Sequence, residues 1–326
     1  MLPEEVQRFL EESGLGAAAA ATPLAGGVSS DIWRVELRDG PVCVKRALPR
    51  LRVQQLWEAP VERNRFEHDW LVEAAKAAPG CVPRVLAQGR GAFAMEYLPP
   101  ERYPVWKALL RDGTADPAFA ARVGETLARI HAATAGRDDL AERFRTDALF
   151  HALRLDPYLV SAAAQHPSLA GPLMKLVETT AGTKRCLVHG DVSPKNILAG
   201  PQGAVFLDAE CAWYGDPAFD AAFCLNHLLL KCLWNPGCTA GYLSCFDALE
   251  ASYFKEVTWE SRGALEARIA RLLPGLLLAR VDGKSPVEYV VEESQKELVR
   301  NTARDLLATP RDRLKDVKGA WQRSLP

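Results

Sequence analysis

Three polar residues at fixed offsets restrict the fold of this chain more than any other feature. The segment from Val188 to Asn196 reads VHGDVSPKN, and Asp208 follows twelve residues later within VFLDAE. Asp191 can accept the proton of an attacking hydroxyl, while Asn196 and Asp208 offer hard oxygen ligands for magnesium ions that neutralise nucleotide phosphates. The spacing fits one short loop between two strands. It therefore predicts a site where a base, a metal and a phosphate meet.

Each of these residues also has an ordinary structural interpretation. His189 suits a hydrogen-bonded core histidine, Asp191 a turn former and Asn196 a helix cap. Five fixed residues at two correlated spacings favour catalysis over three separate coincidences. For His189 alone we favour a scaffold that fixes the loop over proton transfer.

Composition narrows the class of partner. The 326 residues are 48% apolar, which is enough to bury a large core or two lobes, and 40 basic residues balance 41 acidic ones. A net charge of −1 creates no overall field toward nucleic acid, a membrane surface or an acidic partner. We expect a small-molecule substrate and neither nucleic-acid nor membrane binding, and the sequence leaves the oligomeric state open.

Cysteine spacing and the N-terminus predict a cytoplasmic location. The eight cysteines form no C-x-x-C pair and mostly lie in apolar runs, as expected of reduced, buried thiols, and zinc is not expected. The first sixteen residues read as a surface helix rather than a signal peptide, because no basic stretch precedes an apolar one. The apolar runs 221–234 and 272–279 are too short and interrupted to span a bilayer.

The N-terminal third reads as strands around one helix. Three strands are expected between Thr22 and Arg46, separated by a glycine turn at 26–30 and by a hairpin signal at Asp39-Gly40-Pro41. A helix from about Pro60 to Ala78 follows, and then two strands at 84–88 and 91–97. The strand alternation places Lys45 among apolar neighbours, on the face opposite Val42, Val44 and Arg46.

The pattern changes at Pro99-Pro100, which we take as the boundary between residues 1–98 and residues 99–326. Beyond it only brief strands are expected, near 186–188, 196–199 and 204–207. The remainder is largely helical, including 119–133, 147–164, 221–234 and 244–255.

The HGDVSPKN loop, the LDAE segment and GDPAFD after it resemble the aminoglycoside phosphotransferase and choline kinase superfamily. The resemblance extends from the glycine turn near Gly26 to at least Asp220. It implies an α+β, two-lobed protein-kinase-like fold, with an antiparallel sheet and one helix in the N-terminal lobe, a mainly helical C-terminal lobe and ATP in the cleft. It also implies that Asp191 is the base, that Asn196 and Asp208 bind Mg²⁺, and that Asp220 braces the catalytic loop from a buried helix.

Lys45 fits the phosphate-contacting lysine of that superfamily, although in isolation it reads as a snorkelling edge-strand lysine. Its acidic partner should lie on the helix 60–78. There Glu67 precedes Trp70, Leu71 and Ala74 on an inward stripe. Glu62 and Glu73 remain alternatives from the residues alone, and the resemblance points to Glu67 through NRFEHDWL.

Two further segments could contact the nucleotide. At the glycine turn, Gly27, Ser29 and Ser30 can bring backbone amides and hydroxyls to phosphate oxygens, but a plain hairpin turn fits equally and no G-x-G-x-x-G pattern is present. The segment FAMEYL matches the superfamily's hinge, where main-chain groups near Glu96 and Leu98 would pair with adenine.

Two departures from the protein-kinase pattern indicate a small acceptor. Ser193 stands where Ser/Thr protein kinases usually carry lysine, and only Ala209 to Gly215 separate LDAE from DPAFD, which leaves no room for an activation loop. Glu210 adds a second carboxylate, as in the methylthioribose-kinase branch of the superfamily. Metal binding and simple solvation of Glu210 are equally supported.

The acceptor itself is not specified. After Asp220 the chain has 15 Lys/Arg against 13 Asp/Glu, which gives no support to an acidic pocket for a polycationic aminoglycoside. The aromatic pair Trp213-Tyr214, and Trp234 with His227 and Lys231, can line an acceptor site, but core packing is favoured. A later glycine turn carries Arg280, Asp282 and Lys284. These residues could contact the substrate or belong to a solvated loop.

The sequence thus predicts an ATP- and Mg²⁺-dependent phosphotransferase that phosphorylates a hydroxyl of a small metabolite or an aminoglycoside-like compound. A catalytically silent nucleotide-binding module is the alternative, and the joint presence of Lys45, Asp191, Asn196 and Asp208 speaks against it. A protein kinase is disfavoured by the short interval between Asp208 and Asp216.

Overall fold

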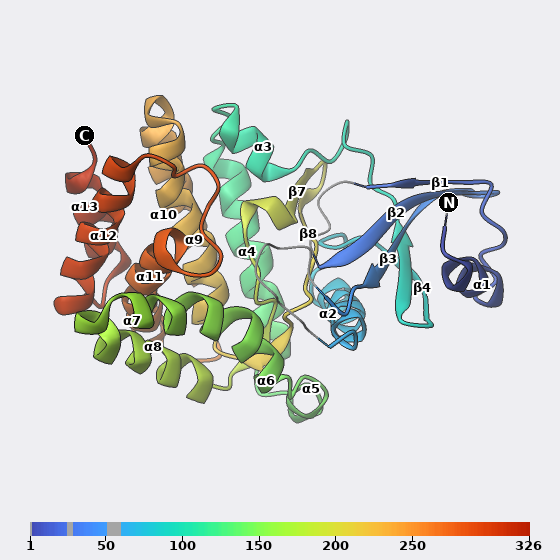
Figure 1. Ribbon diagram of the computed structural model, residues 1–326, viewed down its shortest axis with the longest axis horizontal. Helices are drawn as coiled ribbons and strands as arrows, with labels where there is room; N and C mark the ends of the chain where they lie inside the picture. The colour runs from blue at the N-terminus through green and yellow to red at the C-terminus, as the bar shows by residue number, and fades with distance from the viewer. Residues whose placement is uncertain (1, 25–28, 51–59) are drawn as a thin grey trace.

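The computed structural model describes residues 2–24, 29–50 and 60–326, and it combines one antiparallel sheet with a large helical region (Figure 1). The sheet lies at one end of the molecule with the N-terminus, and the C-terminal helices lie at the other. The predicted α+β class and the predicted order of sheet before helices are confirmed. None of the described helices combines the length and hydropathy needed to cross a bilayer.

Five strands make up the N-terminal sheet, in the order β1-β2-β3-β5-β4 with antiparallel neighbours. Their bounds are Ala20–Pro23 (β1), Ser30–Leu37 (β2), Gly40–Ala47 (β3), Val85–Gly89 (β4) and Ala92–Glu96 (β5). Lys45 sits in the central strand β3, opposite Ile32 on one side and Phe93 on the other. Its backbone is therefore held by strands on both sides.

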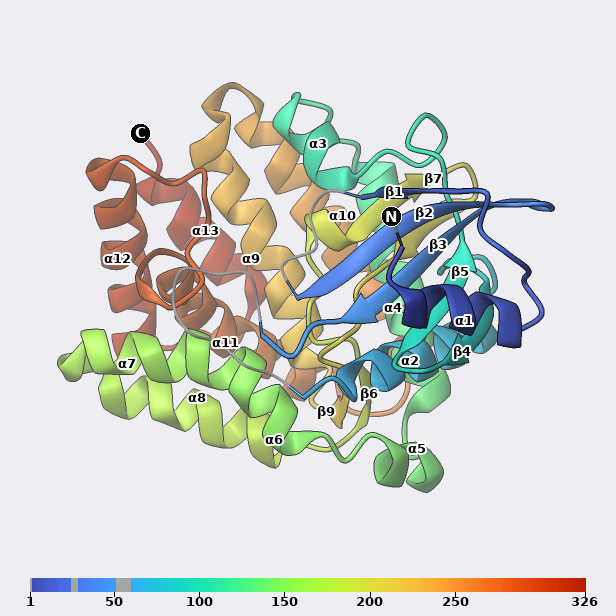
Figure 2. The ribbon, with the colours of Figure 1, turned by 45° about the vertical axis from the view of Figure 1, so that its right-hand side comes forward.

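A helix covers each face of this sheet, as the alternation along β3 requires. Val42 and Val44 pack with Phe9 and Leu10 of α1 (Glu4–Glu12), which lies across the sheet in Figure 2. Cys43 belongs instead to the core that contains Trp70 of α2 (Arg63–Ala77) and the C-terminal helices. Lys45 points to the α2 side, as predicted.

The rest of the chain is mainly helical. Its helices are α3 (Trp106–Arg111), α4 (Pro117–Thr134), α5 (Asp138–Arg143), α6 (Asp147–Phe150), η1 (His151–Val160), α7 (Ser161–Gln165), η2 (Pro167–Leu169), α8 (Ala170–Gly182), η3 (Pro194–Asn196), α9 (Ala218–Trp234), η4 (Pro236–Cys238), α10 (Thr239–Glu256), α11 (Arg262–Asp282), α12 (Glu293–Ala308) and α13 (Leu314–Ser324). The change from strands to helices falls between β5 and α3. A lobe boundary at residues 98 and 99 stays a prediction.

Two short two-stranded antiparallel sheets carry the segments singled out in the sequence. They are β6 (Cys186–Val188) with β9 (Trp213–Gly215), and β7 (Ile197–Gly200) with β8 (Gly203–Phe206). The loop 189–196 joins β6 to β7, and Asp208 follows β8, so one compact unit holds both motifs. Strand β9 was not predicted.

The predicted helix 147–164 is continuous but contains a π-helical stretch, η1, with Pro157 inside it. Proline has no backbone N–H to donate along a helix, which favours a local change in hydrogen bonding. The carbonyl of Pro157 accepts a hydrogen bond from the backbone N–H of Lys284 instead, at 2.8 Å. All eight thiols are free, and all except the partly buried Cys238 are buried.

Candidate active site

The loop 189–196 is held in place by Asp220, which lies in the first turn of α9. Its Oδ2 accepts a hydrogen bond from His189 N at 2.7 Å, and its Oδ1 accepts one from Gly190 N at 2.8 Å. Gly190 has φ +80°, and a Cβ there would lie 2.7 Å from Cys211 O. Only glycine fits this position. These contacts are those expected of a residue that braces the loop.

His189 is a part of the loop's scaffold. Because the backbone N–H of Asp191 donates to Nδ1 at 3.1 Å, Nε2 carries the proton and donates it to Leu207 O at 3.0 Å. The ring also packs edge-on against Trp70 at 4.7 Å between centroids. Burial lowers the pKa of His189, so it is neutral near pH 7. Both nitrogens are occupied, which agrees with the predicted scaffold role.

Asp191 lies at the centre of a hydrogen-bonded cluster and is 3% exposed. Its Oδ2 accepts from Asn196 Nδ2 at 2.8 Å and lies 3.0 Å from the Arg154 guanidinium and 3.2 Å from Lys195 Nζ. Burial alone would raise the pKa of Asp191, but the charges of Arg154 and Lys195 outweigh it and hold that pKa below its usual value. Asp191 is therefore ionised and can accept a hydrogen bond from a hydroxyl.

Arg154 is a site residue that the sequence analysis missed. It reaches Asp191 from the π-helical stretch η1, and its Nε also donates to Gly190 O. A lone arginine in the apolar segment HALRLDPYLV is the signal that could have found it, because a buried arginine needs an anionic partner.

Lys45 joins the sheet, α2 and the LDAE segment. Its Nζ lies 2.7 Å from Glu67 Oε1 and also donates to Asp208 Oδ1, and Lys45 and Glu67 are each 2% exposed. Burial favours neutral Lys45, but the carboxylates of Asp208 and Glu67 outweigh it and raise the pKa of Lys45. Glu67 is thus the acidic partner, as predicted.

The two other candidates for that partner lie elsewhere. Glu73 pairs with Lys76 at 3.0 Å and with Arg143 at 2.8 Å, and Glu62 is exposed just before α2 begins. The stripe that follows Glu67, made of Trp70, Leu71 and Ala74, is buried. It is this stripe that turns Glu67 toward the sheet.

The two residues proposed from sequence as metal ligands line the same cleft. Asn196 uses its Nδ2 to bond Asp191 O at 3.1 Å and Asp191 Oδ2, so its carbonyl oxygen is the atom suited to a cation. Asp208 has φ +67°, which is uncommon for a residue with a side chain, and its side chain is 28% exposed. Although burial opposes it, Lys45 lowers the pKa of Asp208 and keeps it ionised.

Glu210 is neither solvated nor unpaired. Its Oε2 accepts from the Nε of the fully buried Arg63 at 3.0 Å. Arg63 also donates to Ser29 O at 2.5 Å and to Leu48 O at 2.6 Å. The expectation of a simply solvated Glu210 is therefore wrong, because a buried cation from α2 occupies this carboxylate.

The glycine turn is described only in part. Gly27 lies outside the described residues. Ser29 and Ser30 are buried, and the carbonyl of Ser29 accepts from Leu48 N at 2.9 Å while Ser30 begins β2. Neither serine lines the cleft that Lys45, Asn196 and Asp208 share, and Asp191 and Glu210 are also absent from its lining.

That cleft has a volume of about 550 Å³. Catalytic-loop, sheet and hinge residues all line it, including the predicted hinge residues Glu96 and Leu98. Its lining consists of Leu24, Ile32, Cys43, Lys45, Glu67, Pro83, Met95, Glu96, Tyr97, Leu98, Pro100, Tyr103, Val105, Lys107, Lys195, Asn196, Leu198, Leu207 and Asp208. The apolar side chains suit a flat base and the polar ones suit phosphates.

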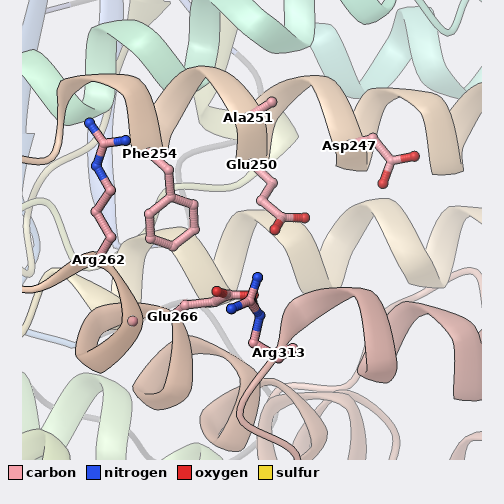
Figure 3. Close-up of a pocket in the computed structure, with 8 residues that line it drawn as sticks. Asp247, Glu250, Ala251, Phe254, Arg262, Glu266 and Arg313 are labelled. Atoms are coloured by element: carbon pink, nitrogen blue, oxygen red, sulfur yellow. The ribbon is translucent and has the colours of Figure 1, made fainter.

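A second hollow, of about 460 Å³, lies between α10, α11 and α13 (Figure 3). It shares no residue with the cleft. Arg313 Nε lies 3.2 Å from Glu266 Oε1, and both point into this hollow. Burial, with the nearby carboxylates of Glu266 and Asp247, raises the pKa of Glu250 to about 7. The motifs do not reach this surface, so the cleft remains the candidate active site.

Arg280, Asp282 and Lys284 tie helices together. Asp282 accepts from Arg300 Nε and Nη2, both at 2.9 Å, and pairs with His166 at 2.8 Å, while Lys284 donates to Asp156 at 2.7 Å. Arg280 is 9% exposed. A solvated loop is therefore the wrong interpretation for Arg280 and Asp282.

Trp213 and Tyr214 belong to the core, as favoured from sequence. Trp213 stacks on Phe150 at 4.2 Å between centroids, and the hydroxyl of Tyr214 donates to Arg185 O at 2.9 Å. Both side chains are buried. These contacts fix β9 beside β6.

Comparisons with known proteins identify the family of the chain. The family model described as "Phosphotransferase enzyme family" matches residues 20–265. Methylthioribose kinase 1 of Oryza sativa subsp. japonica is 23% identical over 274 residues, which cover 68% of this chain and 63% of that protein. The chain thus aligns with less than two thirds of this relative's length.

Two solved structures share the fold. A macrolide 2′-phosphotransferase from Brachybacterium faecium superposes with a TM-score of 0.54 at 16% identity, covering 99% of this chain and 98% of that one. An amicoumacin kinase, solved with AMP-PNP and Ca²⁺, superposes with a TM-score of 0.57 at 15% identity, covering 96% of each chain. The fold is therefore that of protein-kinase-like small-molecule kinases. With the family match over residues 20–265, the chain belongs to the phosphotransferase enzyme family.

Proposed function

We propose that this chain is an ATP- and Mg²⁺-dependent kinase that phosphorylates a hydroxyl of a small metabolite. The observation that carries the proposal is the Lys45 bridge, which joins Glu67 of α2 to Asp208 beside the catalytic loop. A cation fixed between two carboxylates, on the wall of a cleft, is placed to meet the phosphates of a nucleotide.

In this proposal residues 1–98 form the nucleotide-binding lobe, and residues 99–326 form the catalytic and substrate lobe. Lys45 contacts the α- and β-phosphates, and Glu67 orients it. Main-chain groups near Glu96 and Leu98 pair with adenine, whose faces meet the apolar cleft wall. Gly27, Ser29 and Ser30 are the proposed phosphate contacts of the glycine turn once the nucleotide binds, although neither serine lines the cleft in this structure. The hydrogen bond from Arg63 to the Ser29 carbonyl holds Ser29 beside α2.

Asn196 and Asp208 are the proposed holders of Mg²⁺, since both offer hard oxygen atoms within the cleft. The bound metal would neutralise charge on the phosphates. The complex of the amicoumacin kinase with AMP-PNP and Ca²⁺ supports a divalent cation in this fold. Glu210 is a third candidate, although Arg63 already uses its Oε2.

Asp191 is the proposed base. It accepts a hydrogen bond from the hydroxyl of the acceptor molecule. This hydrogen bond orients the hydroxyl oxygen toward the γ-phosphorus. As the new O–P bond forms and the bond to the β-phosphate oxygen breaks, the hydroxyl proton passes to Asp191 and ADP leaves. Because Arg154 and Lys195 lower the pKa of Asp191, we expect positioning and charge stabilisation to contribute more than proton abstraction.

The substitution Asp191→Ala tests this proposal. Once an acceptor is known, we expect its rate of phosphoryl transfer to fall by at least about 10³-fold, because it loses both the base and the orientation of the hydroxyl. The dissociation constant for ATP should change by less than about threefold, because Lys45 and the hinge remain. Transfer at the wild-type rate in this variant would contradict the role of Asp191.

A further inference from the structure

Several buried polar atoms beyond the catalytic loop have no hydrogen-bond partner among the described residues. They include Ser193 Oγ in the loop, Lys231 Nζ on α9, Arg280 Nε on α11 and Tyr289 OH after α11. Lys231 and Ser193 are 0% exposed. Burying such groups without partners costs free energy unless a ligand supplies them.

These residues are linked to the catalytic loop. The Arg280 guanidinium donates to Tyr158 OH at 3.3 Å and lies over the Tyr158 ring. Tyr158 lies in η1, four residues after Arg154, whose guanidinium is 3.0 Å from Asp191 Oδ2. The stretch η1 thus connects Asp191 to Arg280 of α11.

Helix α9 closes the other side of this region. Tyr158 packs edge-on against Phe223 at 5.5 Å, and Phe223 packs against His227 at 5.2 Å. One turn beyond His227, Lys231 Nζ lies 4.1 Å from the Trp234 ring centroid and 3.8 Å from that of Tyr289. The two rings favour a cation there but offer no oxygen to its N–H groups.

The region is rich in positive charge. Burial lowers the pKa of His227, and the charges of Arg280, Lys231, Lys195 and Lys107 lower it further. The nearby carboxylates already have partners, because Glu288 pairs with Lys107 and Asp191 is shared by Arg154 and Lys195. Lys107 and Lys195 also line the nucleotide cleft, so the two regions adjoin.

We propose that Lys231, Arg280, His227 and Tyr289 form an acceptor subsite for an anionic group, so that the substrate is an alcohol carrying a carboxylate or a phosphate. The anion would supply the oxygen acceptors that Lys231 Nζ and Arg280 Nε lack, and the same molecule's hydroxyl would meet Asp191. This inference rests on the proposed function. A polycationic acceptor would be repelled by the same charges.

Matched acceptor pairs test the proposal. ADP release would be measured with glycerol and glycerate, erythritol and erythronate, glycerol and glycerol phosphate, and with ethanolamine as a cationic alcohol. We expect kcat/KM to be at least about 100-fold higher for an anionic member than for its neutral partner, because a site with buried unpaired N–H donors discriminates strongly against a ligand that leaves them unpaired. The carboxylate and phosphate arms identify which anion fits. A neutral or cationic alcohol as the best substrate would overturn the proposal.

The substitution Lys231→Met separates this proposal from a general loss of function. We expect KM for the anionic acceptor to rise by at least about 30-fold, with kcat/KM for the neutral partner changed less than threefold, since only the anion uses the N–H donors of Lys231 Nζ and holds its proton. Lys231→Arg should retain the preference. Lys175→Met, which removes an exposed lysine of α8, is the matched control. Equal effects on both members of a pair would contradict an anion site at Lys231.

Calorimetric titration of glycerate and glycerol phosphate into the protein loaded with Mg²⁺ and AMP-PNP keeps the two proposals apart. Anion binding that Lys231→Met abolishes, without ADP release from any acceptor, would support the subsite and refute the kinase activity. ADP release from neutral alcohols, without binding of either anion, would support the kinase and refute the subsite.

Discussion

On the nucleotide side of the cleft each buried cation has a carboxylate within reach, whereas on the acceptor side Lys231 has none among the described residues. Lys45 contacts Glu67 and Asp208, and Arg63 contacts Glu210. Lys231 faces two aromatic rings, with no hydrogen-bond partner for its Nζ. Among the described residues, Lys45 and Arg63 on the nucleotide side are thus paired before any ligand binds, whereas Lys231 on the acceptor side is not.

This difference follows the division of labour that we propose. A nucleotide used in every turnover is best met by groups already held in place, because ordering them at binding would cost affinity. An acceptor molecule is selected by the hydrogen-bond acceptors that it brings to unpaired groups of the protein. Unsatisfied buried groups therefore mark the side of the site that determines specificity.

The largest expected effect is that of Lys45→Met. It leaves Glu67 and Asp208 without their cation, so we expect kcat/KM for ATP to fall by at least about 100-fold and the free energy of unfolding to fall by about 3 kcal/mol. Steady-state kinetics and urea titration measure the two effects. Lys175→Met, at an exposed ion pair, should change neither appreciably. An unchanged KM for ATP would show that the paired side does not bind the nucleotide.

Next in size is Asp220→Asn, which tests the bracing of the catalytic loop. The amide can replace at most one of the two acceptors used by His189 N and Gly190 N, so we expect kcat to fall by about 30-fold and the free energy of unfolding to fall by about 2 kcal/mol. KM for ATP should change little, because Lys45 is not in contact with this loop segment. A fall in stability without any fall in kcat would limit Asp220 to folding.

Asp208→Asn and Glu210→Gln form a pair that sharpens the metal assignment. We expect Asp208→Asn to raise the Mg²⁺ concentration for half-maximal rate by at least about tenfold, because it removes a charged ligand. Glu210→Gln should raise it by less than about threefold, since its Oε2 is used by Arg63. Rates measured across a Mg²⁺ titration decide between them. Equal increases for the two variants would make Glu210 a metal ligand as well.

The last expected effect leaves activity aside and concerns how the free energy of unfolding depends on pH. Burial, together with Lys107 and Arg280, lowers the pKa of Lys231 to about 6. Between that value and the ordinary lysine pKa, the unfolded chain binds a proton that the folded chain does not. Lys231 therefore makes the free energy of unfolding rise with pH across this window, by at most about 1.4 kcal/mol per pH unit.

Urea titrations of wild type and Lys231→Met at several pH values between 6 and 9 measure this slope. The difference in free energy of unfolding, wild type minus variant, should increase with pH and be most negative near pH 6. The variant should also be more stable than wild type near pH 6, because it no longer buries an unpaired cation. A flat difference would mean that Lys231 is not a buried titrating group, and the contrast between the two sides would then fail.

The sequence was sufficient to predict a residue's position where that position follows from strand alternation or helical spacing nearby. Strand alternation placed Lys45 on its face of the sheet. The helical stripe left Glu62 and Glu73 as alternatives to Glu67, and the family resemblance selected Glu67, so this ion pair could be predicted without coordinates. Arg154 could not be predicted as a contact of Asp191, because a π-helical stretch 37 residues upstream brings it there. The Arg63–Glu210 pair and the unpartnered Lys231 also depend on tertiary packing, which no periodicity reports.

The most direct test of the account is an ADP-release assay over a panel of small alcohols, with the product identified by mass. The panel would include methylthioribose, homoserine, choline, aminoglycosides and the acid and neutral pairs above. The account predicts ADP formation that requires Mg²⁺ and one class of hydroxylated acceptor, with one phosphate gained by that acceptor. Metal-dependent ATP binding without ADP formation across the panel, or phosphate transferred to a peptide alone, would contradict it.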